Sequence, residues 1–420
     1  MGALGCASLA GLSGGGDGGV SVDASSHDAT MSARDARSDS ALGKGDATRR
    51  DGGVPDAAMT AHADTGSDAG CTVCNGACVD TTSNASNCGG CNISCRKCTN
   101  SYCLNYLDDG DPGQAMTALA FVSPLVYWVG AADGGNNVLT GDIVVPSANP
   151  ERIVQYLSGA PLALATDHRS LFIGGVGYIG AFAPPSTFTL LDGGLAAVDA
   201  GVAYLDAGKV QVANSIAVDD ANVYWTDSTQ NTVVQMPKTG GPVVTLITEQ
   251  FGATGITVDS TYVYWVAVGS LFRIAIGSSG VPATLASTTT TGTGPTPLVV
   301  VNGVVYYPDT QTGRIVSIEA SGGTPIAFAM AQANPTALAT DGTSLYWTTN
   351  SPSGCGVVMA PLGGGAPVTI GELSQAGIVL PGGIALATGA DGGAVSHPTV
   401  FVSANVGGVG TLLVLSAPPD

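Results

Sequence analysis

The chain has 420 residues, of which 45% are apolar and only 11% are charged, and its formal net charge is −19. The mean hydropathy is +0.30, yet no run of 18 or more apolar residues is present that could form a membrane-spanning helix. The strong acidity excludes nucleic acid as the expected partner, because nucleic-acid binding depends on clusters of basic residues.

The composition also disfavours helices. Glu and Lys, which normally build helical surfaces, occur four times each, whereas Gly, Val, Thr, Ala and Asp dominate. These abundant residues favour short strands joined by tight turns. The sequence therefore predicts an all-β protein.

The first six residues resemble the end of a bacterial lipoprotein signal. Residues Ala3 to Cys6 match the small-residue motif that precedes a lipidated cysteine. Only five residues stand before Cys6, fewer than a charged segment and an apolar core require. Two interpretations stay open: residues 1–6 are the remnant of a signal with Cys6 as the lipidation site, or the match is chance.

Residues 7–70 are predicted to be a disordered linker. They consist mainly of Gly, Ala, Ser, Asp and Thr, and no aromatic residue occurs before Tyr102. Such a segment cannot bury enough apolar surface to offset the entropy of ordering its backbone.

Residues 71–103 form a predicted cysteine-rich module. Eight of the ten cysteines lie here: Cys71, Cys74, Cys78, Cys88, Cys91, Cys95, Cys98 and Cys103. Pairs of the form C-x2-C could bind zinc as thiolates. The acidic setting and the Gly- and Asn-rich turns favour four disulfides instead, whose pairing the sequence leaves open.

The string "CNGACVDTTSNASNCGGCNISC" at 74–95 resembles the stigma-specific type of cysteine-rich module. This resemblance implies no particular activity. The remaining cysteine, Cys355, stands alone downstream and is expected to be a small buried apolar residue.

Residues 104–420 contain a repeat of 40–44 residues. The phrase reads "SIAVDDANVYWTD" at 215–227, "GITVDSTYVYWVA" at 255–267 and "ALATDGTSLYWTT" at 337–349. This period is typical of the four-stranded blades of a β-propeller. Seven blades are favoured, with six or eight left open, and the short piece at 193–212 is interpreted as a partial or inserted unit.

The last repeat contains only three predicted strands. The segment 103–110 resembles the fourth strand of other repeats, so we expect it to pair with the last blade and close the ring. The recurring aromatic pairs are expected to pack between neighbouring blades.

The tetrapeptide from Tyr224 to Asp227 resembles the YWTD repeat, which builds six-bladed propellers in lipoprotein-receptor ectodomains and their relatives. That resemblance implies a protein-binding scaffold and not an enzyme. The chain departs from the pattern, since about seven units are present and Asp follows the aromatic pair only at Asp227 and Asp309.

A ring of acids and amides is the one candidate site. Each predicted innermost strand ends on such a residue: Asp167, Asp199, Asp219, Asp259, Asn302 and Asp341. An Asp there commonly caps backbone N–H groups of the following turn. The alternative is a site for a cation such as calcium, or for an amine, at the mouth of the channel. No catalytic His arrangement or nucleotide-binding loop is present, and no other cofactor is expected.

These observations predict an extracytoplasmic binding or scaffold protein, secreted or lipid-anchored in the cell envelope. We expect a monomer that recognises a protein, peptide or glycan through loops at 130–143, 174–190, 287–296, 350–356 and 388–398. The membrane would be contacted only through the lipid. Two alternatives remain, a metal-dependent hydrolase or lyase of the lactonase-like kind and a passive structural surface protein.

Overall fold

A computed structural model describes the following residues: 72–74, 77–80, 83, 85–86, 88, 97–107, 115–123, 125–131, 137–143, 152–184, 202–205, 210–267, 269–288, 296–351, 354–373, 378–387, 398–406 and 409–416. All regular structure in this part of the chain is β-strand, which confirms the predicted all-β class. Among these residues no helix is long and apolar enough to cross a membrane.

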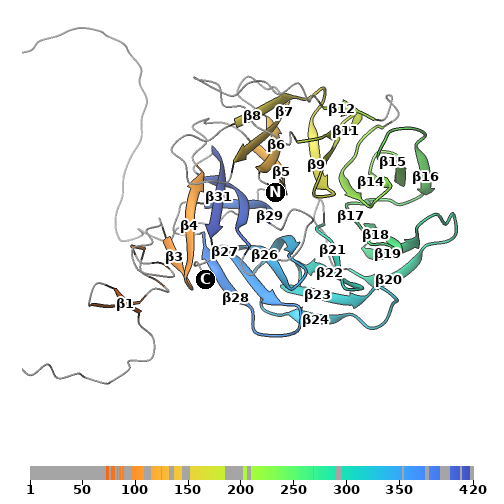
Figure 1. Cartoon of the computed structure of the whole chain (residues 1–420). Coiled ribbons are helices and arrows are strands. Elements are labelled where there is room, and N and C mark those ends of the chain that lie inside the picture. The colour runs from red at the N-terminus through yellow and green to blue at the C-terminus, as the bar shows by residue number, and fades with distance from the viewer. Residues whose placement is uncertain are drawn as a thin grey trace, which may run out of the picture. The chain divides into compact units, whose positions relative to one another are not determined.

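Six antiparallel sheets have four strands each, and they surround a common axis as the blades of a propeller (Figure 1). The first three comprise β5 (Ala115–Val122), β6 (Leu125–Ala131), β7 (Asn137–Ile143) and β8 (Arg152–Tyr156); β9 (Pro161–Thr166), β10 (Leu171–Gly175), β11 (Tyr178–Phe182) and β12 (Ala203–Tyr204); and β13 (Ser215–Val218), β14 (Asn222–Asp227), β15 (Thr232–Pro237) and β16 (Val244–Ile247).

The next three comprise β17 (Gly255–Val258), β18 (Tyr262–Ala267), β19 (Ser270–Ala275) and β20 (Ala283–Ser287); β21 (Val299–Val301), β22 (Val304–Asp309), β23 (Arg314–Glu319) and β24 (Ile326–Ala329); and β25 (Pro335–Thr340), β26 (Ser344–Ser351), β27 (Gly354–Pro361) and β28 (Val368–Glu372). Within each blade the first strand in the chain is innermost and the fourth is outermost, as a meander requires.

A further sheet closes the ring with five strands: β29 (Ile378–Leu386), β30 (Val400–Val406), β31 (Val409–Ser416), β4 (Tyr102–Leu107) and β3 (Lys97–Thr99). Strand β4 pairs with β31 in a register that sets Leu104 opposite Leu415 and Leu107 opposite Leu412. The predicted closure by an N-terminal strand is therefore confirmed. The innermost strands contact one another in sequence around the axis, and β29 contacts β5 to complete the circle.

The aromatic pairs join neighbouring blades, as predicted. The ring of Trp225 packs with Phe172 and Ile179 of the preceding blade. Tyr224, one residue earlier on β14, points to the other side and packs with Val263 and Trp265 of the following blade. Because adjacent residues of a strand face opposite sides, each pair fastens its blade in both directions.

The short piece at 193–212 is not a separate unit where the structure describes it. Its strand β12 pairs with β11 as the outermost strand of the second blade, and Val212 forms an isolated bridge with Val176. This piece looked like a repeat because β12 carries an aromatic residue, Tyr204, in a sequence context like that of the second strand of a blade.

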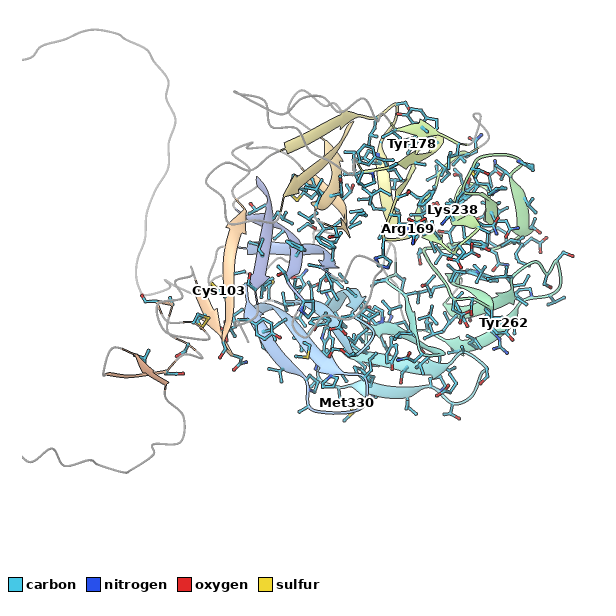
Figure 2. All side chains as sticks on the ribbon, viewed as in Figure 1. Cys103, Arg169, Tyr178, Lys238, Tyr262 and Met330 are labelled. Carbon is cyan, nitrogen blue, oxygen red and sulfur yellow. A yellow bond between two sulfur atoms is a disulfide. The ribbon has the colours of Figure 1, made fainter. Side chains whose placement is uncertain are left out.

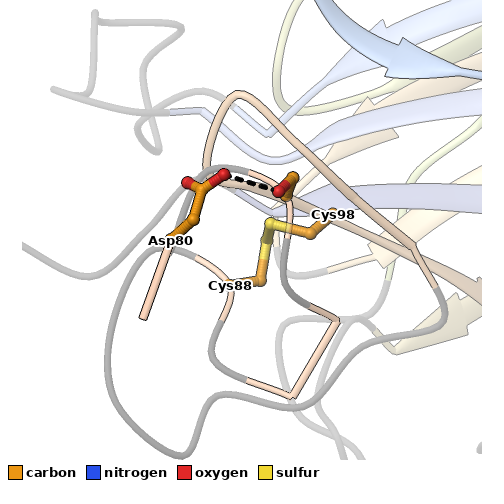
Figure 3. Close-up of a disulfide and its surroundings, with 4 residues drawn as sticks. Asp80, Cys88 and Cys98 are labelled. Carbon is orange, nitrogen blue, oxygen red and sulfur yellow. Dashed lines mark hydrogen bonds between the residues drawn. A yellow bond between two sulfur atoms is a disulfide. The ribbon is translucent and has the colours of Figure 1, made fainter. Parts of the chain in front are cut away.

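The cysteine-rich segment supplies a small sheet and a disulfide. Strand β1 (Thr72–Cys74) pairs with β2 (Ala77–Val79), and Cys88 is bonded to Cys98 on β3 (Figure 3). The hydroxyl of Ser83 donates a 2.7 Å hydrogen bond to Asp80 in the same region. Residues 7–70, predicted to be a linker, lie outside the described residues, as does Cys6.

The expectation for Cys355 was wrong in one respect. Its side chain is only 4% exposed, as expected for a buried cysteine, but it is disulfide-bonded and not isolated. A sequence pattern cannot show such a bond, because no other cysteine lies within 250 residues of it.

Candidate functional site

The two ends of the propeller differ in construction. We call the end where the innermost strands finish the Asp face, because the predicted acids lie there. The opposite end, where the chain passes from one blade to the next, is called the linker face. Five of the six predicted site residues occupy the Asp face, directly after β9, β13, β17, β21 and β25: Asp167, Asp219, Asp259, Asn302 and Asp341. Asp199 lies outside the described residues.

Asp259 shows how these carboxylates are used. One oxygen, Oδ1, accepts 2.7 Å hydrogen bonds from the backbone N–H groups of Thr261 and Tyr262. The other, Oδ2, accepts a 2.8 Å bond from the hydroxyl of Tyr264. Asx turns of this kind fix the chain reversal after the strand, and the tyrosine bond ties the turn to the second strand of the blade.

The same arrangement recurs in two other blades. Asp219 accepts from the N–H groups of Ala221 and Asn222 at 2.7 and 2.6 Å, and its Oδ2 accepts from Tyr224 at 2.7 Å. Asp341 likewise accepts from Tyr346 at 2.9 Å. In all three pairs the tyrosine follows the acid by five residues, a spacing that is visible in the sequence.

These tyrosines are donors over the whole physiological pH range. Burial raises the pKa of Tyr264 well above its usual value, and the hydrogen bond with Asp259 adds to that shift. Burial and the Asp341 carboxylate do the same for the pKa of Tyr346. A carboxylate that accepts a hydrogen bond from a neutral phenol disfavours loss of the phenol proton, so each pair is stable as a carboxylate with a neutral tyrosine.

Two positions of the ring depart from this pattern. The residue five positions after Asp167 is Phe172, which has no hydroxyl group to donate. Oδ2 of Asp167 instead forms a 2.6 Å salt bridge with Nζ of Lys238 in the next blade. Burial alone would raise the pKa of Asp167, but the hydrogen bonds from Lys238 and from two backbone N–H groups hold it below its usual value. Figure 2 shows Lys238 on the blade that follows the blade of Arg169.

Asn302 adopts a positive φ of 52°, a conformation that Asn tolerates better than most residues. Its Nδ2 donates to the carbonyl oxygen of Gly342 in the next blade at 3.5 Å. At these five positions the acids accept hydrogen bonds from turns, tyrosines or Lys238, and the amide bonds to the next blade. No group of three or more His, Cys, Asp or Glu side chains within the described ranges has the spacing of a metal site.

The linker face contains a feature that the sequence analysis missed. The indole Nε1 of Trp265 donates a 2.8 Å bond to Oε1 of Gln250, and that of Trp347 donates a 2.9 Å bond to Oε1 of Gln332. Each glutamine belongs to the linker that enters the blade of its tryptophan. The 15-residue spacing between Gln and Trp, present twice, is the signal that could have revealed these pairs.

The same linkers hold their backbone in an unusual conformation. Glu249 and Ala331, which precede the two glutamines, have φ values of 61° and 57°. The side-chain amide nitrogen of Gln332 donates back to the carbonyl of Met330 at 2.8 Å. A left-handed alanine persists only where the surrounding contacts determine the backbone, so these linkers are rigid.

Among the described residues, three large apolar side chains are exposed on the linker face. Val176 is 47% exposed in the β10–β11 turn, and Phe251 is 59% exposed beside Gln250. Met330, labelled in Figure 2, is 68% exposed in the β24–β25 linker. The backbones of two of them are hydrogen-bonded: Val176 N–H donates to Ala160 O at 2.9 Å, and the Met330 carbonyl accepts from Nε2 of Gln332 at 2.8 Å. The loops predicted at 174–190 and 350–356 contribute turns to this face, whereas 388–398 is covered by the described residues only at its end.

No family model matches the chain, and no curated protein matches it. Solved structures do share its fold. The catalytically inactive variant of virginiamycin B lyase from Staphylococcus aureus, solved with quinupristin, has a TM-score of 0.54 and 13% identity over 75% of this chain and 99% of that chain.

A streptogramin B lyase structure has a TM-score of 0.52 and 11% identity, and the match covers 75% of this chain and 98% of that one. A chain of a nidogen/laminin complex matches with a TM-score of 0.41 and 15% identity over 54% of this chain and 86% of that chain. At these identities the first two likenesses show the propeller fold alone.

Proposed function

We propose that the protein is an extracytoplasmic recognition module that binds a protein partner at its linker face. The observation that carries this proposal is the set of exposed apolar side chains, Val176, Phe251 and Met330, in turns whose backbone is fixed by hydrogen bonds. Large apolar groups that protrude from a rigid surface are the typical anchors of a protein interface.

The rigidity of these turns matters for affinity. Association is opposed by the entropy lost when loops and side chains become ordered at the interface. At Phe251 that loss is small, because its neighbours Glu249 and Gln250 are already held by the left-handed backbone and by the bond to Trp265. Binding energy from the phenyl ring is therefore not spent on ordering the linker.

The charge of the chain restricts the partner. With a formal net charge of −19, the protein attracts cationic partners and repels anionic ones at long range. A neutral or basic protein surface with apolar pockets fits both properties.

The disulfide between Cys88 and Cys98 supports the proposed compartment, since such bonds persist in oxidising environments outside the cytoplasm. Attachment to the envelope through a lipid on Cys6 is part of the proposal. Recognition is favoured over catalysis because the residues within the seven innermost strands carry no charged side chain, and the carboxylates that follow those strands are bound to backbone and tyrosine donors.

The proposal is tested by site-specific photo-cross-linking in the producing cells. A benzophenone amino acid is placed at position 251 or 330 and, as a control, at Val281, which is 95% exposed on the Asp face. We expect one discrete cross-linked protein from positions 251 and 330 and none from 281. Equal products at all three positions would show non-specific contact.

A competition experiment distinguishes specific binding from a cross-link formed by chance proximity. An excess of unmodified protein should suppress the cross-link, whereas the double variant Phe251→Ser, Met330→Ser should not. The matched control is Ile326→Ser, which removes an equally exposed side chain (64%) from the outermost strand β24 and should compete like the wild type. If the double variant also competes fully, the apolar anchors are not the binding surface.

A further inference from the structure

Tyr204 is an exposed aromatic residue whose ring is held in one orientation. It lies on β12, the outermost strand of the second blade, and it is 45% exposed. Its ring meets the ring of Tyr178 on β11 at an interplanar angle of 79°, with the two centroids 5.4 Å apart. Its hydroxyl oxygen accepts a 3.0 Å hydrogen bond from the backbone N–H of Ser158. Because these two contacts fix the side chain, little conformational entropy is left to be lost on binding.

The support behind Tyr204 is built around two glycines. Tyr178, labelled in Figure 2, is only 3% exposed, and its ring lies against Gly159 and Gly175. A Cβ on Gly175 would overlap Cε1 of Tyr178. A Cβ on Gly159 would lie 2.5 Å from the carbonyl oxygen of Val176 and 3.3 Å from the same Cε1. The Tyr178 ring therefore fits into the blade only because both positions lack a side chain, and it gives the exposed ring a packed base.

The surface around the Tyr204 ring is polar but uncharged. No charged residue occurs in the described segments of this region, which are 157–163, 171–182, 202–205 and 210–213. Ser158 is exposed, and so are Gly177 and Gln211, whose backbones are joined by a 2.9 Å hydrogen bond. The Tyr204 hydroxyl acts as an acceptor toward Ser158, so its own proton can be donated to a ligand. These groups fit a ligand that is neutral and has both apolar and hydroxyl surface.

We propose that Tyr204 is the platform of a binding site for a neutral sugar ring. One face of a pyranose ring presents C–H groups, and their positive ends are attracted by the negative face of an aromatic ring. The sugar hydroxyls at the rim can accept the phenol proton and bond with nearby hydroxyl and amide groups, the few placed polar contacts that fix a ligand's orientation. The formal net charge of −19 disfavours acidic saccharides. This site is additional to the proposed protein-binding surface and does not depend on it.

The test is native electrophoresis of the full chain in gels that contain a soluble polysaccharide. The acidic protein migrates toward the anode, whereas a neutral polysaccharide stays in place and retards a protein that binds it. The probes are laminarin, mannan and a neutral galactan, with anionic alginate as the control. We expect the wild type to be retarded in at least one of the neutral gels and not in alginate. Free migration in all the neutral gels, or equal retardation in alginate, would overturn the proposal.

Variants at position 204 separate the ring from its hydroxyl group. Tyr204→Ala removes the platform and should abolish the retardation. Tyr204→Phe keeps the ring and should weaken binding by about two- to tenfold, the usual effect of one hydrogen bond. The matched control Phe251→Ala removes a more exposed ring, at 59%, and should bind like the wild type. If Tyr204→Ala is retarded as strongly as the wild type, the ring is not the platform; if Tyr204→Ala does not fold, an unbound Phe251→Ala decides against the proposal in the same way.

The cross-linking experiment distinguishes the sugar site from the proposed protein surface. Tyr204→Ala should leave the cross-linked product from position 251 unchanged. Loss of that product would assign the Tyr204 ring to the protein interface, and the sugar site would be wrong. If position 251 gives no product in the wild type while a neutral polysaccharide still retards it, the protein surface is refuted and the sugar site stands.

Discussion

The pairs of tyrosine and aspartate allow a quantitative test, because Tyr127 occupies the same position of its blade without an acid five residues earlier. Tyr346 is 2% exposed and donates to Asp341, which is itself only 4% exposed. Tyr127 occupies the corresponding position in the first blade, where the residue five positions earlier is Val122. Its buried hydroxyl has no hydrogen-bond partner.

Replacement of each tyrosine by phenylalanine keeps the ring and removes only the hydroxyl. Tyr346→Phe should lower the free energy of unfolding by about 2–3 kcal/mol, because water cannot reach Asp341 to replace the charge-assisted bond. Tyr264→Phe should cost less, about 1–2 kcal/mol, because Asp259 is half-buried and can be hydrated. Tyr127→Phe should raise stability by about 1 kcal/mol, since an unsatisfied hydroxyl is removed.

The assay is equilibrium unfolding in urea, followed by tryptophan fluorescence, for the wild type and the three variants under one condition. The ranking matters more than the absolute values, because each variant keeps its aromatic ring and differs from the wild type by one hydroxyl group. If Tyr127→Phe destabilises the protein as much as Tyr346→Phe, then hydroxyl removal costs free energy without an aspartate, and the reasoning is refuted.

Three further predictions concern closure, close packing and pH. Leu104→Ala should lower the free energy of unfolding by about 2–5 kcal/mol in the same urea assay, because this side chain is only 2% exposed and belongs to the core. An unchanged unfolding midpoint would show that β4 does not contribute to that core. Gly255→Ala should destabilise the protein strongly, because the added Cβ would overlap a backbone carbonyl oxygen. Gly363→Ala places its Cβ in open space and should leave stability unchanged. Similar thermal midpoints for the two variants would contradict this difference. Burial raises the pKa of Tyr307 to about 12. The contribution of the neutral Tyr307 to stability is therefore complete below the pKa of about 10 that it has in the unfolded chain, and it is lost as the pH rises from about 10 toward 12. Circular dichroism across that pH range should show the loss.

The propeller could be predicted from the sequence because its signals are local and periodic. Alternating strand patterns, the aromatic pairs and the Asp turns each lie within one blade, and their recurrence gives the period. The closing strand was also predictable, since "CLNYLDDG" at 103–110 carries the pattern of a fourth strand without the other three.

Features that depend on contacts between separate segments escaped prediction. The bond from Trp265 to Gln250 joins a blade strand to the linker that enters the blade, and neither residue type is unusual by itself. The partner of Asp167 is Lys238, 71 residues away, and only the ring geometry brings the two together. The candidate acids were located correctly at strand ends, but their use became evident only from the donors around them.

The pairing of β4 with β31 also constrains how the chain can fold. The two strands are separated by some 300 residues, and β4 leaves the ribosome first. At typical synthesis rates of roughly 5–20 residues per second, β4 waits on the order of tens of seconds for its partner. Until then the blade β25–β28 has no neighbour on one side, and the edge of β4 is open to pairing with other chains. Conditions that slow synthesis should therefore favour aggregates built from incomplete rings.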